Sequence, residues 1–309
     1  MGLRYGIIGT GAVGGYYGGR LANAGKEVHF LLHSDYEYIR TNGLAVHSCN
    51  GDFHLPQVNA YHNAQDMPAC DVIIVAMKTT NEEYVPDLVR PLLKENSLIL
   101  LIQNGIGVEE DMQQSLPGVQ LAAGLAFICS SKTEPGVVNH QCYGSINIAN
   151  YSCSDEMLIT RVITDFHESN VAAHLLEYQE ARWKKAVWNM PFNGMTVALN
   201  TQTDKLLSHP ATRALIRCQM MEIVNATRVL GVKNVDETFV EKMLVTTDVM
   251  VPYSPSMKLD YDFHRPMEIK YIYSRPLDIA EKAGCPMPSL RMLEEELLFI
   301  QKQRLGKQE

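Results

Sequence analysis

The spacing of hydrophobic residues changes near the middle of the chain. Residues 71–77 (DVIIVAM) and 97–102 (SLILLI) are short apolar runs without alternation, which is typical of central parallel strands buried on both faces. Beyond about Glu177 such runs disappear, and apolar residues recur at helical spacing, for example from Ile216 to Leu230. The pattern predicts an α/β domain that is followed by an all-helical domain.

The other predicted elements follow the same division. In the first half, strands and helices alternate, and residues 137–149 are expected to form a hairpin-type extension. We expect further strands at residues 4–8, 27–32 and 120–127, and further helices at residues 12–24, 84–93, 108–116, 235–245 and 289–303. The sequence contains no internal repeat and no low-complexity tract.

Residues 183–200 (WKKAVWNMPFNGMTVALN) form a predicted helix whose pattern is the reverse of a surface helix. Most of its residues are apolar, and Pro191 is expected to kink it without changing the register of its faces. At about 100° per residue, five polar positions fall within an arc of about 80°. These positions are Lys185, Asn189, Asn193, Thr196 and Asn200. The helix is therefore predicted to be mostly buried, with its narrow polar stripe facing something polar.

This polar stripe is a candidate substrate site. Taken alone, a lysine is ordinarily a solvated surface residue, and a buried asparagine ordinarily bonds nearby backbone. Together they favour a site, because convergent polar groups on apolar walls mark ligand pockets. Lys185 with Asn189 and Asn193, and no carboxylate among them, suits a small oxygen-rich ligand and an anion best.

The beginning of the sequence matches the fingerprint of a dinucleotide-binding fold. Residues 9–14 (GTGAVG) follow a predicted strand and open a predicted helix, and a second strand comes next. Gly9 allows the tight turn, Gly11 lets the backbone approach a pyrophosphate, and Gly14 lets the helix pack on the strand. The free N–H groups at the helix N-terminus then hold the phosphates.

These features together predict the fold class. We expect an α/β protein with an N-terminal Rossmann-type doubly wound sheet over residues 1–174 and an all-helical substrate and catalytic domain over residues 175–309.

The tip of the second strand bears on the choice of cofactor. Proteins that bind NAD usually carry Asp or Glu there, about 20 residues after the glycines. Here His33 and Ser34 occupy the tip and could donate to a 2′-phosphate, whereas Asp35 comes late. The pattern modestly favours NADP (NADPH).

Composition and charge narrow the class of function. The chain has 309 residues, a formal net charge of −8 and no long basic run, so nucleic acid is not expected as a partner. Its apolar stretches are too short to span a membrane, and we expect no cleavable signal because a strand already begins at Arg4. Seven cysteines are scattered without CxxC spacing, which predicts reduced thiols, a cytoplasmic location and no metal site.

Five segments together resemble the ketopantoate reductase (2-dehydropantoate 2-reductase) family, and the resemblance covers almost the whole chain. They are GTGAVG, Lys78 after VIIVAM, Asn104-Gly105-Ile106-Gly107 after LLIQ, WKKAVWNMPFN, and SPSMKLDYDFHRPMEIKYI. The resemblance implies an oxidoreductase that reduces a 2-keto acid with NADPH. Ketopantoate is the expected substrate and pantoate the product, on the route to pantothenate and coenzyme A.

The resemblance also implies roles for individual residues. Lys185 matches the family's catalytic lysine, and Glu268 matches its glutamate beside the nicotinamide and ribose. The implied substrate-binding residues are Asn104, Lys185, Asn189, Asn193 and Ser256. The implied cofactor-binding residues are Gly9, Thr10, Gly11, Ala12, Val13, Gly14, His33, Lys78, Asn104, Ser130 and Glu268, with Ser130 the most loosely aligned.

The implied reaction gives the lysine a chemical task. Hydride addition to a ketone leaves charge growing on oxygen, which must be stabilised or protonated. Lys185 can do both. Burial would lower the pKa of Lys185 and the Glu268 carboxylate would raise it, so we expect its charged form to be poised near physiological pH.

The sequence departs from the family pattern close to the expected pocket. His33 stands where the family often has arginine, Leu259 where it often has glutamine, and Lys270 where it often has an acid. Pro276, within a helical stretch, predicts a kink or break. These differences leave the reductase chemistry intact but leave the identity of the 2-keto acid open, so a dehydrogenase of another small 2-hydroxy acid is an alternative. A second alternative, from a different class, is a non-catalytic dinucleotide-binding sensor. A homodimer is left open as well.

Overall fold

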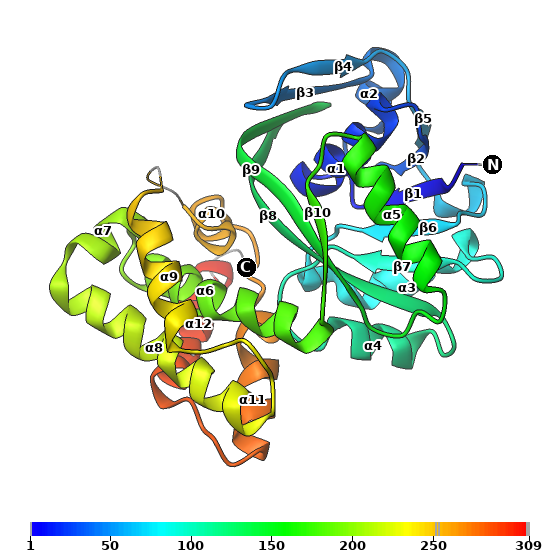
Figure 1. Ribbon diagram of the computed structural model, residues 1–309. Helices are drawn as coiled ribbons and strands as arrows, with labels where there is room; N and C mark the ends of the chain where they lie inside the picture. Colours follow the sequence, from blue (N-terminus) through cyan, green and yellow to red (C-terminus); the bar gives the residue numbers. More distant parts are fainter. Residues whose placement is uncertain (1, 251, 253, 307–309) are drawn as a thin grey trace. The chain divides into compact units, whose positions relative to one another are not determined.

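The computed structural model describes residues 2–250, 252 and 254–306. The chain forms two compact units (Figure 1). The first runs to Gln103 and resumes from Val108 to Tyr178, and the second comprises Asn104–Gly107 and the chain from Gln179 onward. The short segment Asn104–Gly107 therefore belongs to the second unit, although the sequence on either side of it belongs to the first.

The first unit is built on a sheet that has ten strands among the described residues. The strands are β1 (Arg4–Ile8), β2 (Glu27–Leu31), β3 (Leu44–Ser48), β4 (Phe53–Leu55), β5 (Asn59–Tyr61), β6 (Val72–Val75), β7 (Leu98–Leu101), β8 (Gln120–Glu134), β9 (Val137–Asn150) and β10 (Ala173–Leu176). Their order in the sheet is β4-β3-β9-β8-β7-β6-β1-β2-β5, and β10 pairs with β9. The central strands β6 and β7 are buried along their whole length, as their apolar runs predict.

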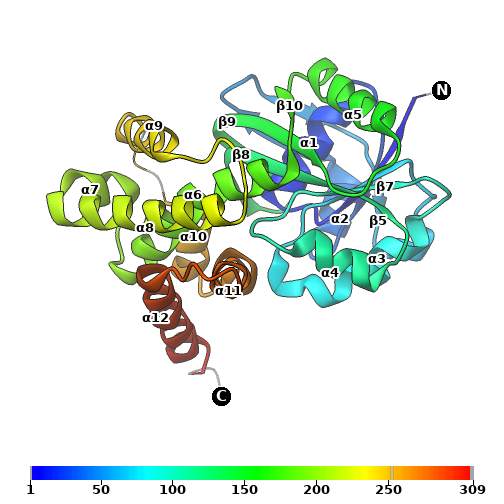
Figure 2. The same ribbon diagram turned by 60° about the horizontal axis from the view of Figure 1, so that its bottom comes forward.

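Most neighbouring strands of this sheet are parallel. Within the described chain only β8–β9 and β3–β4 pair in antiparallel fashion. The helices are α1 (Ala12–Asn23), α2 (Tyr36–Asn42), α3 (Val85–Val89), α4 (Val108–Ser115) and α5 (Glu156–Glu168). In Figure 2, α1 and α5 lie on one face of the sheet and α3 and α4 on the other, which is the doubly wound arrangement.

Some predicted elements of this unit are wrong in detail. The helix expected at residues 84–93 is split into a 3₁₀ turn (Thr79–Tyr84), α3 and a second 3₁₀ turn (Arg90–Leu92). Pro86 and Pro91 stand at the first turns of the later pieces, where a proline without an N–H can begin a helix but cannot continue one. β8 continues past the expected residue 127 to Glu134 and forms the predicted hairpin with β9. The short strands β3, β4, β5 and β10 and the helices α2 and α5 were not predicted.

The second unit is helical throughout its described residues. Its elements are α6 (Tyr178–Ala198), α7 (Thr203–Ser208), α8 (Pro210–Val229), α9 (Glu237–Asp248), α10 (Ser256–Asp262), a π-helical turn η4 (Lys270–Ser274), α11 (Arg275–Lys282) and α12 (Pro288–Leu305). Its core gathers the apolar faces of these helices, with Trp183, Val187 and Phe192 of α6 fully buried. The break expected at Pro276 is present, because η4 ends where α11 begins and Pro276 lies in the first turn of α11.

Candidate active site

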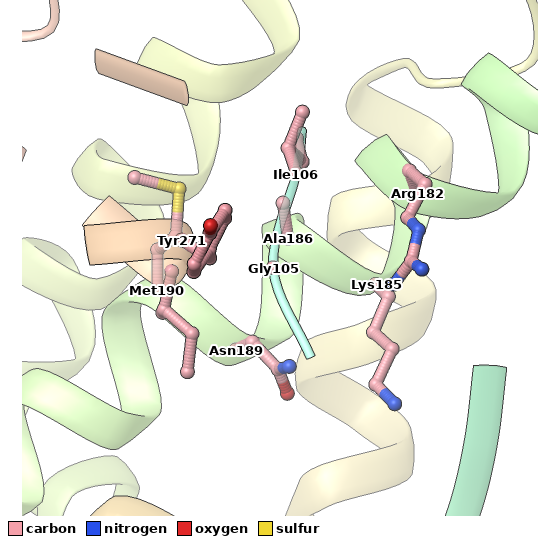
Figure 3. Close-up of a pocket in the computed structure, with 9 residues that line it drawn as sticks. Gly105, Ile106, Arg182, Lys185, Ala186, Asn189, Met190 and Tyr271 are labelled. Atoms are coloured by element: carbon pink, nitrogen blue, oxygen red, sulfur yellow. The ribbon is translucent and has the colours of Figure 1, made fainter. Parts of the chain in front are cut away.

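Helix α6 turns part of its polar stripe toward a small pocket in the second unit. Lys185 and Asn189 line this pocket, and Figure 3 shows their side chains extending in the same direction from successive turns of α6. The other lining residues are Gly105, Ile106, Arg182, Ala186, Met190, Tyr271 and Ile272. Most of this wall is apolar, so the lysine and the amide are concentrated where a small polar molecule could be bound.

The remaining positions of the predicted stripe, Asn193, Thr196 and Asn200, do not line this pocket. Asn193 is 1% exposed and its Oδ1 accepts a hydrogen bond from the Met257 N–H at 3.0 Å. Thr196 donates its hydroxyl to the Phe192 carbonyl of its own helix, and Asn200 lies beyond Ala198, where α6 ends. The Asn193 Oδ1 atom and the Thr196 hydroxyl are therefore engaged within the protein, whereas Lys185 and Asn189 line the pocket.

The electrostatics around Lys185 suit an acid that works near neutral pH. Burial is the largest influence and lowers the pKa of its ammonium, and the Arg182 guanidinium lowers it further. The Glu268 carboxylate acts in the opposite direction, and together they bring the pKa of Lys185 from 10.5 to about 7. Both protonation states of Lys185 are therefore accessible at physiological pH.

Glu268 and Asn104 belong to the same group of residues. Glu268 is 5% exposed, and its Oε2 accepts a long hydrogen bond of 3.4 Å from Asn104 Nδ2. The structure thus brings together three residues that the sequence predicts for the site, Lys185, Glu268 and Asn104. A buried carboxylate at this position offers the lysine a counter-charge and accepts a hydrogen bond at the same time.

The turn after Asn104 is fixed by its glycines. The Ile106 N–H donates to the Tyr271 carbonyl at 2.9 Å, which ties the turn to the π-helical segment. Gly105 has φ +97°, and a Cβ there would lie 2.4 Å from the Tyr271 oxygen. Only glycine fits this position, because both the dihedral and the close approach exclude a side chain. π-Helical turns often mark functional sites, and this one supplies Tyr271 and Ile272 to the pocket.

Ser256 begins α10 and is partly buried. The next residue, Met257, is the one whose N–H is held by Asn193. Asn193 therefore fixes the position of the segment that carries Ser256.

In the first unit, the glycine-rich turn has the geometry that its fingerprint requires. Gly9 has φ +91°, and a Cβ at Gly14 would lie 2.2 Å from the Gly9 carbonyl oxygen. A Cβ at Gly11 would meet nothing within 4 Å, so this position faces open space. α1 begins directly after Gly11, and no side chain caps its N-terminus. The first N–H groups, those of Ala12 and Val13 among them, are thus suited to holding a phosphate group.

The other predicted cofactor residues occupy the neighbouring loops and strands. Lys78 follows β6 and precedes the 3₁₀ turn Thr79–Tyr84. Ser130 lies on β8, and its buried Oγ has no hydrogen-bond partner within the described residues. Thr10 donates its hydroxyl to the Leu31 carbonyl at 2.9 Å, which joins the glycine-rich turn to the end of β2.

The tip of β2 carries imidazole rather than a free carboxylate. His33 is exposed and its ring stacks on that of His62, with centroids 6.3 Å apart. Asp35 is 7% exposed and forms an ion pair with Lys132, and the Gly136 N–H donates to its Oδ2 at 3.2 Å. The carboxylate that the sequence offers as a late candidate for a ribose is therefore bound to the protein itself.

Several residues of these sites were missed in the sequence. Arg182 precedes Lys185 by about one helical turn, and extending the stripe backward by that turn would have found it. Tyr271 joins the pocket through an irregular helix, and Lys132 and His62 reach the end of β2 from distant segments. A local sequence pattern does not predict contacts between segments that are distant in the sequence.

The described residues offer no metal-ion site and no membrane-spanning helix. Among the described residues, no group of three or more His, Cys, Asp or Glu side chains is placed to hold a metal ion. No helix in the described part of the chain is long and apolar enough to cross a membrane. All seven cysteines lie within the described residues, and none of them forms a disulfide.

Comparison with known proteins places these features in a family. The model of ketopantoate reductase PanE/ApbA matches residues 5–152, and the model of its C-terminal part matches residues 177–301. A 2-dehydropantoate 2-reductase of Nostoc sp. is 43% identical over 303 residues, which is 96% of this chain and 95% of that protein. The crystal structure of 2-dehydropantoate 2-reductase from Geobacter metallireducens GS-15 superposes with a TM-score of 0.92 at 36% identity and covers 97% of this chain and 99% of its own.

A more distant structure has the same fold. D-mandelate dehydrogenase, solved with NADH and anilino(oxo)acetate, has a TM-score of 0.89 at 21% identity and covers 98% of this chain and 99% of its own. The two family models together span most of the sequence, and the Nostoc relative matches nearly all of it. The chain therefore belongs to the ketopantoate reductase PanE/ApbA family.

Proposed function

We propose that the protein is an NADP-dependent oxidoreductase that reduces 2-dehydropantoate to pantoate, a step of pantothenate biosynthesis. Residues 1–174 bind the cofactor, and residues 175–309 bind substrate and carry the catalytic lysine. The observation that carries the proposal is the pocket in which Lys185 lies beside Asn189 with its pKa lowered to about 7. The 2-dehydropantoate 2-reductases at 43% and 36% identity support the choice of reaction.

The chemistry assigned to the chain is proton delivery and charge stabilisation. The nicotinamide, when bound, supplies a hydride to the ketone carbon. Lys185 Nζ gives a proton to the ketone oxygen as charge develops there and is left as a neutral amine. Glu268 holds the lysine in its charged form before the transfer, while burial and Arg182 favour the release of the proton. The apolar wall of the pocket strengthens these interactions by excluding water.

We assign substrate recognition to uncharged side chains of the second unit. Asn189 offers both a donor and an acceptor to a hydroxyl group, and Ser256 offers a hydroxyl to the substrate carboxylate. Asn104 bridges toward Glu268 and is assigned to both cofactor and substrate. Asn193 contributes by holding Met257, the neighbour of Ser256.

NADP is the proposed cofactor. The glycine-rich turn, with Gly11 open and α1 uncapped, fits a pyrophosphate. The D-mandelate dehydrogenase of the same fold was solved with NADH, which supports a nicotinamide dinucleotide in general. The phosphorylated form is favoured because no acid stands at His33 or Ser34 and Asp35 is held by Lys132. Lys78 and Ser130 are assigned to the same cofactor.

We also propose the partners and the cellular location of the protein. The partners are a small 2-keto acid and, in solution, a second copy of the chain. Cysteines that form no disulfide, together with a net charge of −8, fit a cytoplasmic protein that binds neither nucleic acid nor membrane.

The purified protein should reduce 2-dehydropantoate faster than any other member of a panel of 2-keto acids. Reduced-nicotinamide absorbance, followed with NADPH and with NADH, gives kcat/KM for each pair. We expect 2-dehydropantoate to exceed an analogue without the hydroxyl group by about tenfold or more, because an unmet buried polar group costs about 1–3 kcal/mol. NADPH should be preferred over NADH by a small margin, since His33 is a weaker phosphate ligand than arginine.

Two outcomes of this panel would contradict the proposal. Failure to turn over 2-dehydropantoate, with activity on another keto acid, would leave only a reductase of a different substrate. A clear preference for NADH would overturn the choice of cofactor.

A further inference from the structure

An ion pair joins three segments around the end of β2. Lys132 Nζ, on β8, pairs with the Asp35 carboxylate and also donates to the Thr10 carbonyl at 2.7 Å. Thr10 belongs to the glycine-rich turn, and its hydroxyl donates to Leu31, the last residue of β2. The lysine therefore connects the tip of the β8–β9 hairpin to the glycine-rich turn and to the residue that follows the β2 tip.

The pair is shielded from solvent. The exposed fractions of the two side chains are 17% for Lys132 and 8% for Asp35. The Gly136 N–H, in the turn of the hairpin, donates to the same carboxylate at 3.2 Å. Gly136 has φ +68°, and a Cβ there would lie 2.7 Å from the Tyr38 ring, so only glycine fits this turn. The Asp35 carboxylate is thus held in one orientation by a cation and a backbone donor.

The position of this carboxylate matters for cofactor choice. In Rossmann folds an acid near the end of the second strand binds the ribose hydroxyls of NAD and repels the 2′-phosphate of NADP. An unneutralised Asp35 next to the Thr10–Leu31 junction would exert such repulsion at short range. With Lys132 beside it, the charge is compensated and its oxygen atoms are engaged.

We propose that Lys132 is a positioning residue for cofactor specificity: by pairing with Asp35 it neutralises and immobilises the carboxylate that follows the β2 tip, and so admits a 2′-phosphorylated dinucleotide. This inference rests on the proposed function insofar as that function requires a nicotinamide dinucleotide. It concerns discrimination between NADPH and NADH and leaves the chemistry at Lys185 unaffected.

The test is a comparison of equilibrium binding without keto acid. The Kd values of NADPH and NADH are measured by nicotinamide fluorescence for the parent, Lys132→Met, Asp35→Asn and the double variant Lys132→Met/Asp35→Asn. In Lys132→Met we expect the Kd of NADPH to rise about tenfold and that of NADH to change by about twofold at most. The double variant should return the ratio of the two Kd values close to that of the parent, because the uncompensated charge is gone.

A matched control is available in the same unit. Lys94 pairs with Asp71 at 2.6 Å, and Asp71 directly precedes β6, at the opposite end of the strands from the glycine-rich turn. Lys94→Met removes an ion-paired lysine but should leave the NADPH to NADH ratio unchanged. Thermal unfolding of Lys132→Met and Lys94→Met separates loss of stability from loss of discrimination.

Each outcome of the binding comparison supports or contradicts a specific part of the inference. An unchanged ratio in Lys132→Met, or equal weakening of both cofactors, would overturn the inference in favour of a purely structural lysine. If the double variant stays as weak for NADPH as Lys132→Met, the lysine itself binds the phosphate and the neutralisation mechanism is wrong. If the parent binds neither cofactor, the proposed function fails, and that result is distinguishable from every result above.

Discussion

Replacing Lys185 by methionine is expected to lower kcat for the reduction of 2-dehydropantoate by about 100-fold or more, the scale of general acid catalysis. Methionine keeps much of the apolar stem of the lysine, so the pocket wall formed with Ala186 and Met190 should persist. What is lost is the group whose pKa lies at about 7 and which can protonate the ketone oxygen. Steady-state assays at saturating NADPH and keto acid measure the effect, and NADPH binding should change little.

The neighbouring lysine supplies the control. Lys184 lies on the same helix but pairs with Glu180 at 2.5 Å, and it does not line the pocket. Lys184→Met should therefore retain nearly the parent kcat. Turnover by Lys185→Met within a few fold of the parent would remove Lys185 from the proton transfer.

Gly105→Ala is expected to lower kcat/KM by about 100-fold, although residue 105 carries no chemical group of its own. The added Cβ would lie 2.4 Å from the Tyr271 carbonyl oxygen, so the turn that carries Asn104 and Ile106 must move. Its hydrogen bond from Ile106 N–H to Tyr271 would be broken or lengthened. Displacements of about 1 Å near reacting groups cost rates of this order.

Gly107→Ala separates this clash from backbone strain. Gly107 also has a positive φ, +90°, but a Cβ there would come no closer than 3.8 Å to its nearest neighbour, in Arg275. Both variants meet the dihedral penalty for a left-handed residue, of about 1–2 kcal/mol. Only Gly105→Ala should lose most of its activity while it remains folded by circular dichroism. Equal activity in the two variants would show that the approach to Tyr271 is unimportant for the site.

The elements that the sequence predicts well are those with strong local patterns. The buried strands β6 and β7, the first strand and its glycine-rich turn, and the long helices α6 and α8 each carry a periodicity or a motif of their own. The short strands β4 and β5 have three residues each and lie at the two edges of the sheet order. A strand of three residues is too short to show a periodic pattern of apolar residues, and its pairing depends on neighbours that are distant in sequence.

The candidate site was predictable in its chemistry but only partly in its geometry. Four site residues stand at positions of the family motifs, and the structure places all of them in the second unit. They are Asn104, Lys185, Asn189 and Glu268. Asn193 also stands at a motif position, but its Oδ1 accepts a hydrogen bond from the Met257 backbone. Helical spacing alone does not predict a bond to a segment so distant in the sequence. The ion pair of Asp35 with Lys132 was beyond prediction because it depends on where the tip of a long hairpin lies.

The pH dependence of kcat/KM tests the central claim, that a lysine with a pKa near 7 delivers the proton, most directly. Lys185 is charged below its pKa and can donate, whereas above that pKa it is neutral and cannot. Reduction of 2-dehydropantoate by NADPH should therefore fall about tenfold per pH unit above roughly pH 7, and oxidation of pantoate by NADP⁺ should rise through the same pH. In Glu268→Gln the break should move to lower pH, because the charge that raises the pKa of Lys185 is removed. A profile that stays level up to about pH 10, where an ordinary lysine titrates, would contradict the account.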